Sequence, residues 1–244
     1  YIFRSMQGKF SQFNWSRDYQ ILPEVPNVLT SFNGRLFAFS LNTTYRINPI
    51  TLEVEDVFEG VGCINDGSLI VTEYGMCFAD QDNIYLHDGT RPQVISQSIA
   101  RGSKDSYRDF SGGWQDNVKD YVKISFDSKR KSFLVFFSYS AGGSDYNRCW
   151  AYNILYKRWD LLSSPGKITN TFIEQDGSVF LTTVAGEVYH YMSGDSFKPW
   201  SWTSKDLIMG GATQDKKIKK VRINSSDTIN SSDIDISYNN GIDL

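Results

Sequence analysis

The chain has 244 residues, a formal net charge of −3 from 25 basic and 28 acidic side chains, and 16 Phe, 14 Tyr and 6 Trp residues. This charge balance argues against a dedicated nucleic-acid surface, because neutralising phosphates requires clustered Lys and Arg. The length allows a sizeable core, and the sequence contains no apolar run near the roughly 18 residues of a membrane span.

Four segments in chain order carry one pattern: an apolar strand, a polar turn and a second strand that carries Tyr. The pattern occurs at 33–48 (NGRLFAFSLNTTYRIN), 74–89 (YGMCFADQDNIYLHDG), 131–159 with a longer hairpin, and 176–191 (DGSVFLTTVAGEVYHY). Alternation of apolar and polar residues, with many aromatics, favours half-buried β-strands. The pattern therefore predicts an all-β chain built from repeated hairpins.

The spacing of the repeat is set by four marker tyrosines. Tyr45, Tyr85, Tyr152 and Tyr189 are 40, 67 and 37 residues apart, and the long interval contains 96–121, which lacks strand-like alternation. Without those 26 residues the interval falls to 41. A period near 40 with four short strands per unit is typical of β-propeller blades.

The expected domain is a β-propeller over 1–215, with about four to six four-stranded blades and an irregular insert at 96–121. Four of the blades are predicted at 27–58, 68–96, 122–163 and 168–206. Because one small sheet cannot bury both of its faces, neighbouring blades should stack. Residues 216–244 are predicted as a flanking strand pair, the start of a second β-domain or a closing blade. The chain begins and ends in strand-like segments, so we expect a fragment of a longer protein or a processed one.

Turn signals accompany the predicted strands. Asx-Gly pairs can supply the positive φ angles that tight hairpins require. The pairs are Asn33-Gly34, Asp66-Gly67, Asp88-Gly89 and Asp176-Gly177. Their predicted role is structural and needs no substrate.

The search for catalytic chemistry assigns no catalytic, cofactor or metal residue. His87 and His190 lack a nearby motif such as Gly-x-Ser-x-Gly, and we expect both to be structural or surface residues. Glu53, Glu55 and Asp56 alternate along one strand, which favours an exposed face over a glycosidase pair. The run DQDN at 80–83 fails the calcium-loop pattern at Ile84, so it is predicted as a hairpin turn.

The remaining candidates concern thiols, tryptophans and lysines. Cys63, Cys77 and Cys149 lack the spacing of a disulfide framework and are expected to be buried reduced thiols. The basic run 216–220 is expected on a solvated strand or hairpin face. The tryptophans could form a sugar-binding platform or, more commonly, pack between blades; they are Trp150, Trp159, Trp200 and Trp202.

Several features follow one another along the chain: the strand with Tyr1, Phe3, Arg4 and Ser5, then Gly62, Cys63 and Ser68, then Tyr85, Asp88 and Gly89, and finally Ile95 and Ser96. Together with WAYNILYKRWDLL at 150–162 and the strand pair after residue 216, they resemble the β-propeller of tail nozzle, or tail hub, proteins of short-tailed bacteriophages. The resemblance covers most of the chain. Proteins of that family are usually much longer and have a second β-domain.

The resemblance implies a non-enzymatic structural component of the virion tail. Such proteins form a ring, commonly sixfold, that lets genomic DNA pass without sequence recognition and carries adaptor, fibre or other tail proteins. A closed ring requires a head-to-tail interface. We expect the 96–121 insert to contact a neighbouring subunit or tail protein, because it alone breaks the repeat. The alternatives are a carbohydrate- or receptor-binding propeller at a tail tip, which needs an exposed Trp and Tyr cluster, and a glycan-cleaving enzyme, which needs converging carboxylates.

Overall fold

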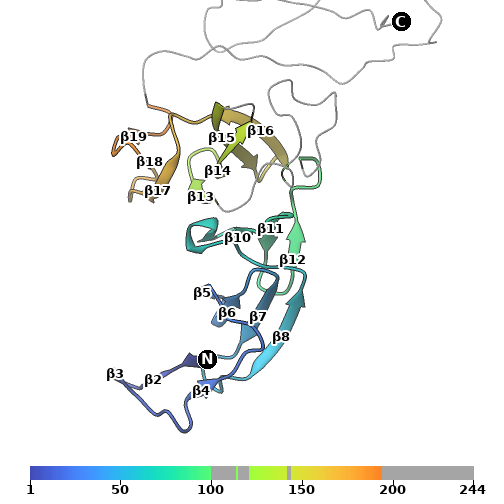
Figure 1. The fold of residues 1–244 in the computed structure, drawn as a ribbon, viewed down its shortest axis with the longest axis vertical. Helices are drawn as coiled ribbons and strands as arrows, with labels where there is room; N and C mark the ends of the chain where they lie inside the picture. The colour runs from blue at the N-terminus through green and yellow to red at the C-terminus, as the bar shows by residue number, and fades with distance from the viewer. Residues whose placement is uncertain (100–113, 115–120, 142–143, 194–244) are drawn as a thin grey trace, which may run out of the picture. The chain divides into compact units, whose positions relative to one another are not determined.

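The computed structural model describes residues 1–99, 114, 121–141 and 144–193 (Figure 1). The chain divides into compact units of Tyr1–Gly194 and Asp195–Leu244, and the second unit lies outside the described residues. The boundary expected at residue 215 and the segment 216–244 are therefore also outside them. Within the described part the regular elements are antiparallel strands and one short 3-10 turn, which confirms the all-β class.

The first two complete sheets follow the repeat closely. Sheet 1 contains β5 (Val28–Phe32), β6 (Arg35–Phe39), β7 (Thr43–Ile47) and β8 (Val54–Glu59), paired in chain order. Sheet 2 contains β9 (Leu69–Thr72), β10 (Gly75–Ala79), β11 (Ile84–His87) and β12 (Pro92–Val94), paired in the same way. Both confirm the four-stranded units expected at 27–58 and 68–96.

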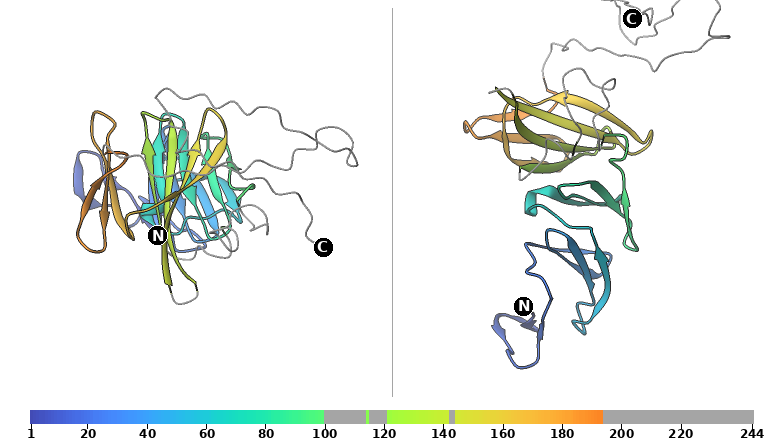
Figure 2. Two further views of the ribbon diagram at one scale, coloured as in Figure 1. Left: turned by 90° about the horizontal axis from the view of Figure 1, so that it is seen from above. Right: turned by 45° about the vertical axis from the view of Figure 1, so that its right-hand side comes forward.

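The next two sheets differ in strand length and number. Sheet 3 contains β13 (Val122–Asp127), β14 (Ser132–Ala141), β15 (Ser144–Asn153) and β16 (Arg158–Ser163). Its β14–β15 hairpin projects beyond its neighbours (Figure 2). Sheet 4 contains β17 (Ile168–Ile173), β18 (Val179–Thr183) and β19 (Val188–His190). The fourth strand expected near 201–206 lies outside the described residues.

The N-terminal segment forms two small strand pairs. β1 (Ile2–Phe3) pairs antiparallel with β4 (Tyr19–Gln20), and β2 (Ser5–Met6) pairs with β3 (Lys9–Phe13) between them. Ile2 and Leu22 pack against Tyr45 and Ile47 of sheet 1. Residues 1–22 thus form a small strand unit that precedes sheet 1 in the chain and packs against it.

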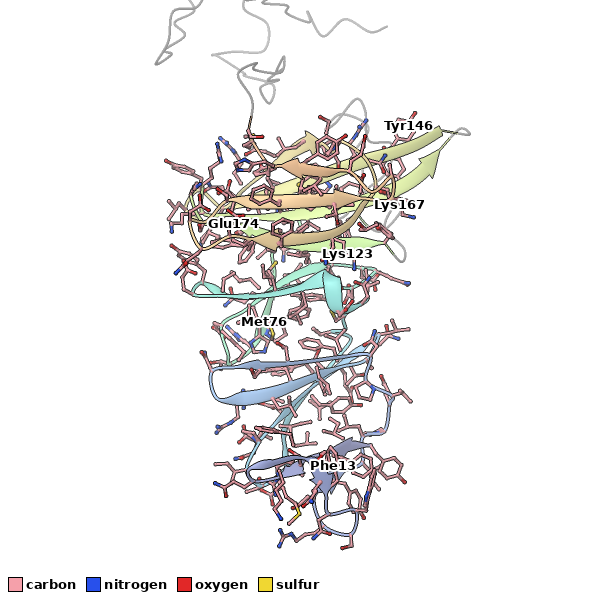
Figure 3. All side chains as sticks on the ribbon, turned by 90° about the vertical axis from the view of Figure 1, so that its left-hand side faces the viewer. Phe13, Met76, Lys123, Tyr146, Lys167 and Glu174 are labelled. Carbon is pink, nitrogen blue, oxygen red and sulfur yellow. The ribbon has the colours of Figure 1, made fainter. Side chains whose placement is uncertain are left out.

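Apolar side chains fill the space between successive sheets (Figure 3). Phe37 and Phe39 of sheet 1 pack against Met76, Phe78 and Tyr85 of sheet 2. Separate clusters join sheet 2 to sheet 3 and sheet 3 to sheet 4. In addition, β13 lies beside both β9 and β17, so the first strands of sheets 2, 3 and 4 run next to one another. Inner sheets are thus buried on both faces, as the stacking argument predicted.

The marker tyrosines lie on the third strands of the four sheets. Tyr45, Tyr85, Tyr152 and Tyr189 belong to β7, β11, β15 and β19. Each packs with the element that precedes its own sheet, from the N-terminal pair to sheet 3. The repeat read from the sequence therefore corresponds to one structural unit, repeated along the chain.

The turn predictions were right for three Asx-Gly pairs and wrong for one. Gly34, Gly89 and Gly177 have φ angles of 71°, 102° and 81°. Gly67 is not among the positive-φ glycines, because Asp66-Gly67 begins a 3-10 turn over Asp66–Ser68 instead of a two-residue hairpin. The Ser68 hydroxyl, which accepts from Asn65 N–H at 3.0 Å, stabilises that turn.

Candidate functional site

An arginine from sheet 1 binds a turn of sheet 2. Arg46 on β7 donates from Nη1 to the carbonyl oxygens of Gly89 and Thr90, both at 3.3 Å. Its guanidinium also pairs with Asp56 at 2.8 Å and Glu55 at 3.5 Å, and the side chain is only 20% exposed. The planar guanidinium can reach all four groups because its donors are fixed in a fork. Arg46 is therefore a clamp between the two sheets.

The turn that Arg46 binds is itself shaped by an aspartate. Asp88 Oδ1 accepts from the N–H groups of Thr90 at 2.7 Å and Arg91 at 3.1 Å, and these bonds hold the pKa of Asp88 below its usual range. Asn48 and Asn153 make the same turn after the third strands of sheets 1 and 3. An Asx turn after the third strand is thus repeated in sheets 1, 2 and 3.

His87 lies at the seam between sheets 1 and 2. Its side chain is fully buried, and its ring meets Phe37 at 5.0 Å and Phe58 at 5.4 Å between centroids, both nearly perpendicular. Nδ1 accepts from the N–H of Gly89 at 2.9 Å, whereas Nε2 is buried without a hydrogen-bond partner in the described part of the chain. Burial lowers the pKa of His87 to about 4. His87 is therefore a structural histidine, as the sequence predicted.

The Gly-Cys pair and Ser68 of the resemblance form the crossing from sheet 1 to sheet 2. Cys63 N–H donates to Ser40 O at 2.9 Å, and Gly62 N–H donates to Asp80 Oδ2 at 3.4 Å. The Cys63 thiol lies 3.2 Å from Ser68 Oγ. A side chain at Gly62 would collide with the backbone of Leu41, so glycine is required there. These residues hold the linker in place and do not form a reactive centre.

Asp80, Glu55 and Asp56 are engaged in local structure. Asp80 Oδ1 accepts from Asp82 N–H at 2.8 Å and Asn83 N–H at 2.6 Å, which makes 80–83 the hairpin turn that was predicted. Burial raises the pKa of Asp80. Glu55 pairs with Arg35 at 2.6 Å, and this arginine holds the pKa of Glu55 below its usual range. Glu55 and Asp56 of β8 thus serve as partners for arginines, whereas Glu53 is exposed.

Tryptophans of sheet 3 and of the insert lie in the core. Trp150 and Trp114 are fully buried, and Trp159 is 7% exposed. Trp159 donates from Nε1 to Ile95 O at 2.8 Å, and Trp114 donates to Asp80 O at 3.2 Å. Packing between sheets is therefore their role, and they form no sugar platform. Trp200 and Trp202 lie outside the described residues.

Exposed aromatic rings gather instead at the N-terminal pair. The N-terminal aromatic cluster comprises Tyr1, Phe3, Phe13, Trp15 and Tyr19. Phe3 and Trp15 meet edge to face at 4.5 Å, while Tyr1 stacks on Phe3 at 6.0 Å. Tyr1 and Trp15 are 71% and 67% exposed. The aromatic strand is visible in the sequence, but the position of Trp15 beside it depends on the pairing of β1 with β4 across the 15 residues between them.

The second histidine also lies on a sheet face. His190 on β19 stacks on Phe180 at 4.6 Å, and Phe180 stacks on Phe172 at 4.9 Å. His190 is exposed, which agrees with the surface role that was expected. The stack of Phe172, Phe180 and His190 contains no nucleophile that His190 could activate.

Two grooves lie where β9, β13 and β17 meet. Their volumes are about 320 and 310 Å³, and Ile70 and Ile173 line both. Neither lining contains His or Cys. Across residues 1–99, 114, 121–141 and 144–193, no His, Cys, Asp and Glu side chains gather in a way that could hold a metal ion. That same part of the chain has no helix with the length and apolar character of a transmembrane span.

Comparison with known proteins adds little to this geometry. No protein-family description and no curated protein matches the sequence. The extracellular domain of a putative one-component system from B. thetaiotaomicron is a similar solved structure, with a TM-score of 0.47 and 12% identity over 72% of this chain. The match spans 22% of that longer chain.

Proposed function

We propose that this chain is a structural subunit of a bacteriophage tail, a nozzle or hub protein whose β-propeller assembles into a ring. The ring, commonly sixfold in the family that the sequence resembles, would let DNA pass and anchor fibres or other tail proteins. In this proposal the protein is a scaffold without catalytic residues, and its location is the virion.

The observation that carries the proposal is the serial packing of the sheets. Each inner sheet is buried on both faces, and its first strand lies beside the first strand of the next sheet. First strands that run together, with later strands farther out, suit radial blades around an axis. Arg46 and Trp159 add polar ties across two of the seams. Sheets packed on both faces in this way suit the wall of a channel.

Assembly is the first test. The chain would be purified and examined by mass photometry and negative-stain electron microscopy. We expect rings, and we expect Trp15→Ser to weaken them at least tenfold by opening the N-terminal aromatic cluster, an available contact surface. Leu155→Ser, at a residue 66% exposed on a turn of sheet 3, is the matched control. A protein that stays monomeric at all concentrations would contradict the ring.

The insert needs a sharper experiment than its removal. Ile99 and Trp114 belong to the core cluster between sheets 2 and 3, so deleting 96–121 would damage the fold. Replacing residues 101–112 with a Gly/Ser linker of equal length keeps both side chains. Loss of rings with an unchanged melting temperature supports a contact role for the insert, whereas normal rings refute it.

A glycan-binding propeller is the second candidate, and the N-terminal aromatic cluster favours it. Exposed Tyr and Trp rings can stack on sugar faces, and their polar edges suit partly wet sites. Glycan-array binding that Trp15→Ser abolishes, in a protein that forms no ring, would favour this function over the nozzle.

A further inference from the structure

The imidazole of His87 fills the seam between sheet 1 and sheet 2. Phe37 of β6 and Phe58 of β8 contact it from sheet 1, while His87 itself ends β11 of sheet 2. The side chain has no exposed surface. Any change in its charge therefore acts directly on the contact between two sheets.

Hydrogen bonding fixes the form of the ring that this seam accepts. The Gly89 N–H points at Nδ1 at 2.9 Å, so Nδ1 must be the unprotonated nitrogen and Nε2 carries the proton. Protonation would place an N–H on Nδ1, where it would face the N–H of Gly89, and two donors cannot bond each other. The Gly89 bond is thus incompatible with the imidazolium.

The charges around His87 do not rescue the imidazolium. Arg46 from β7 is bonded to Gly89 O and Thr90 O, and it disfavours a second positive charge nearby. The negative charge of Asp88 favours the His87 imidazolium, but Asp88 Oδ1 already accepts hydrogen bonds from Thr90 N–H and Arg91 N–H. The other charged groups on the packed elements already have partners or are exposed; they are Arg35, Glu55, Asp56 and Arg91. Burial outweighs the remaining attraction.

We propose that His87 makes the seam between sheets 1 and 2 acid-sensitive: protonation breaks the Gly89 bond, frees the 88–91 turn from Arg46 and separates the two sheets locally. The 88–91 turn contains both the Gly89 N–H that bonds His87 and the Gly89 and Thr90 carbonyls that bond Arg46. Protonation of His87 therefore weakens both contacts between the sheets. Sheets 3 and 4 lack a buried histidine among the described residues and stay closed.

The direction and the size of the pH effect on seam opening follow from proton linkage. In the open seam His87 titrates near its ordinary value of about 6.5, and in the closed seam its pKa is about 4. The open state therefore binds more protons, and the closed seam is lost as pH falls. Between pH 7 and pH 4.5 the opening equilibrium rises on the order of 50-fold.

Hydrogen exchange resolved by peptide measures this opening. Corrected for intrinsic rates, exchange in peptides from β6–β8 and β11–β12 should rise on the order of 50-fold between pH 7 and pH 4.5, while peptides from β13–β16 change little. His87→Phe should abolish the rise, and His190→Gln, at the chain's other histidine, should keep it. An equal rise in His87→Phe, or no selective rise in the unmodified protein, overturns the proposal.

A second readout covers the case in which His87→Phe does not fold. Imidazole Cε1–H signals of the unmodified protein and of His190→Gln identify both histidines by nuclear magnetic resonance. A His87 signal that titrates below pH 5 supports the proposal. Titration of that signal near pH 6.5 overturns it.

Discussion

Arg4 and Arg46 make the same contacts in two successive units. Arg4 donates to the carbonyls of Pro49 and Ile50, as Arg46 does to those of Gly89 and Thr90, and each pair of carbonyls belongs to an Asx turn. Arg4 pairs with Asp18 at 2.9 Å and Arg46 with Asp56 at 2.8 Å. The β1–β4 pair therefore contacts the Asx turn of sheet 1 in the way that β7 and β8 contact the Asx turn of sheet 2. The structural repeat thus includes the N-terminal segment.

The clamp predicts that Arg46→Lys lowers stability. A lysine keeps the charge, but its single ammonium cannot bond two carbonyls and two carboxylates together. We expect a loss of about 1–3 kcal/mol in the free energy of unfolding, measured by urea titration. Arg158→Lys is the control, since the Arg158 side chain is 67% exposed and pairs with Asp160 on the surface. Equal effects of the two variants would show that Arg46 is not a clamp.

Gly62 should tolerate no side chain. An alanine Cβ would lie 1.9 Å from Leu41 O, and backbone cannot move aside without disturbing the Cys63–Ser40 bond. We expect Gly62→Ala to cost about 1–3 kcal/mol. Gly166→Ala, whose Cβ would meet Thr183 at 3.4 Å, should stay within about 0.5 kcal/mol of the unmodified protein. Thermal unfolding compares them, and a harmless Gly62→Ala would mean that the crossing is looser than described.

The three thiols should be unreactive in the folded protein. Cys63, Cys77 and Cys149 are free and buried, and burial raises the pKa of Cys63 to about 12 and that of the other two as well. Because the thiolate is the reactive form, a disulfide reagent at pH 8 should label none of them within minutes. All three should react in about 6 M guanidinium chloride, because only hyperstable proteins have an unfolding midpoint above about 5 M. Rapid labelling of the folded protein would contradict burial.

Trp159 should stabilise the contact between sheets 2 and 3. Trp159→Phe leaves Ile95 O without its donor and removes ring volume beside Tyr152. A loss of about 1–3 kcal/mol is expected in urea titrations. Tyr156→Phe, at a residue 75% exposed, is the control and should change the free energy by less than about 0.5 kcal/mol. A Trp159→Phe variant as stable as this control would leave the indole bond without a role.

Local pattern predicted the repeat units better than the special positions within them. Tyr45 and Tyr85 each lie three residues before an Asx turn residue, but in sheet 3 the residue three before Asn153 is Trp150. The marker Tyr152 lies two residues further along the same face of β15. Sequence spacing found the correct strand and face, while the long hairpin concealed the equivalent residue.

The insert shows a different limit. Residues 96–121 lack alternation, and no sequence pattern indicated that Ile99 and Trp114 enter the core between sheets 2 and 3. The backbone N–H of Trp114 donates to Ile99 O at 2.9 Å, and these two residues are far apart in the sequence. A contact of this kind cannot be predicted from the spacing of a sequence repeat. The contact of this insert with a neighbouring subunit or tail protein stays a prediction.

Alternation, Asx-Gly pairs and the 40-residue period were enough to establish the strands, their order and the stacking of sheets, because these depend on residues a few positions apart and on the need to bury two apolar faces. The arginine clamps, the buried ring of His87 and the place of Trp114 were decided only by the tertiary structure. Each depends on a partner brought near by the packing of separate sheets, and the identity of that partner is not encoded in the spacing of neighbouring residues.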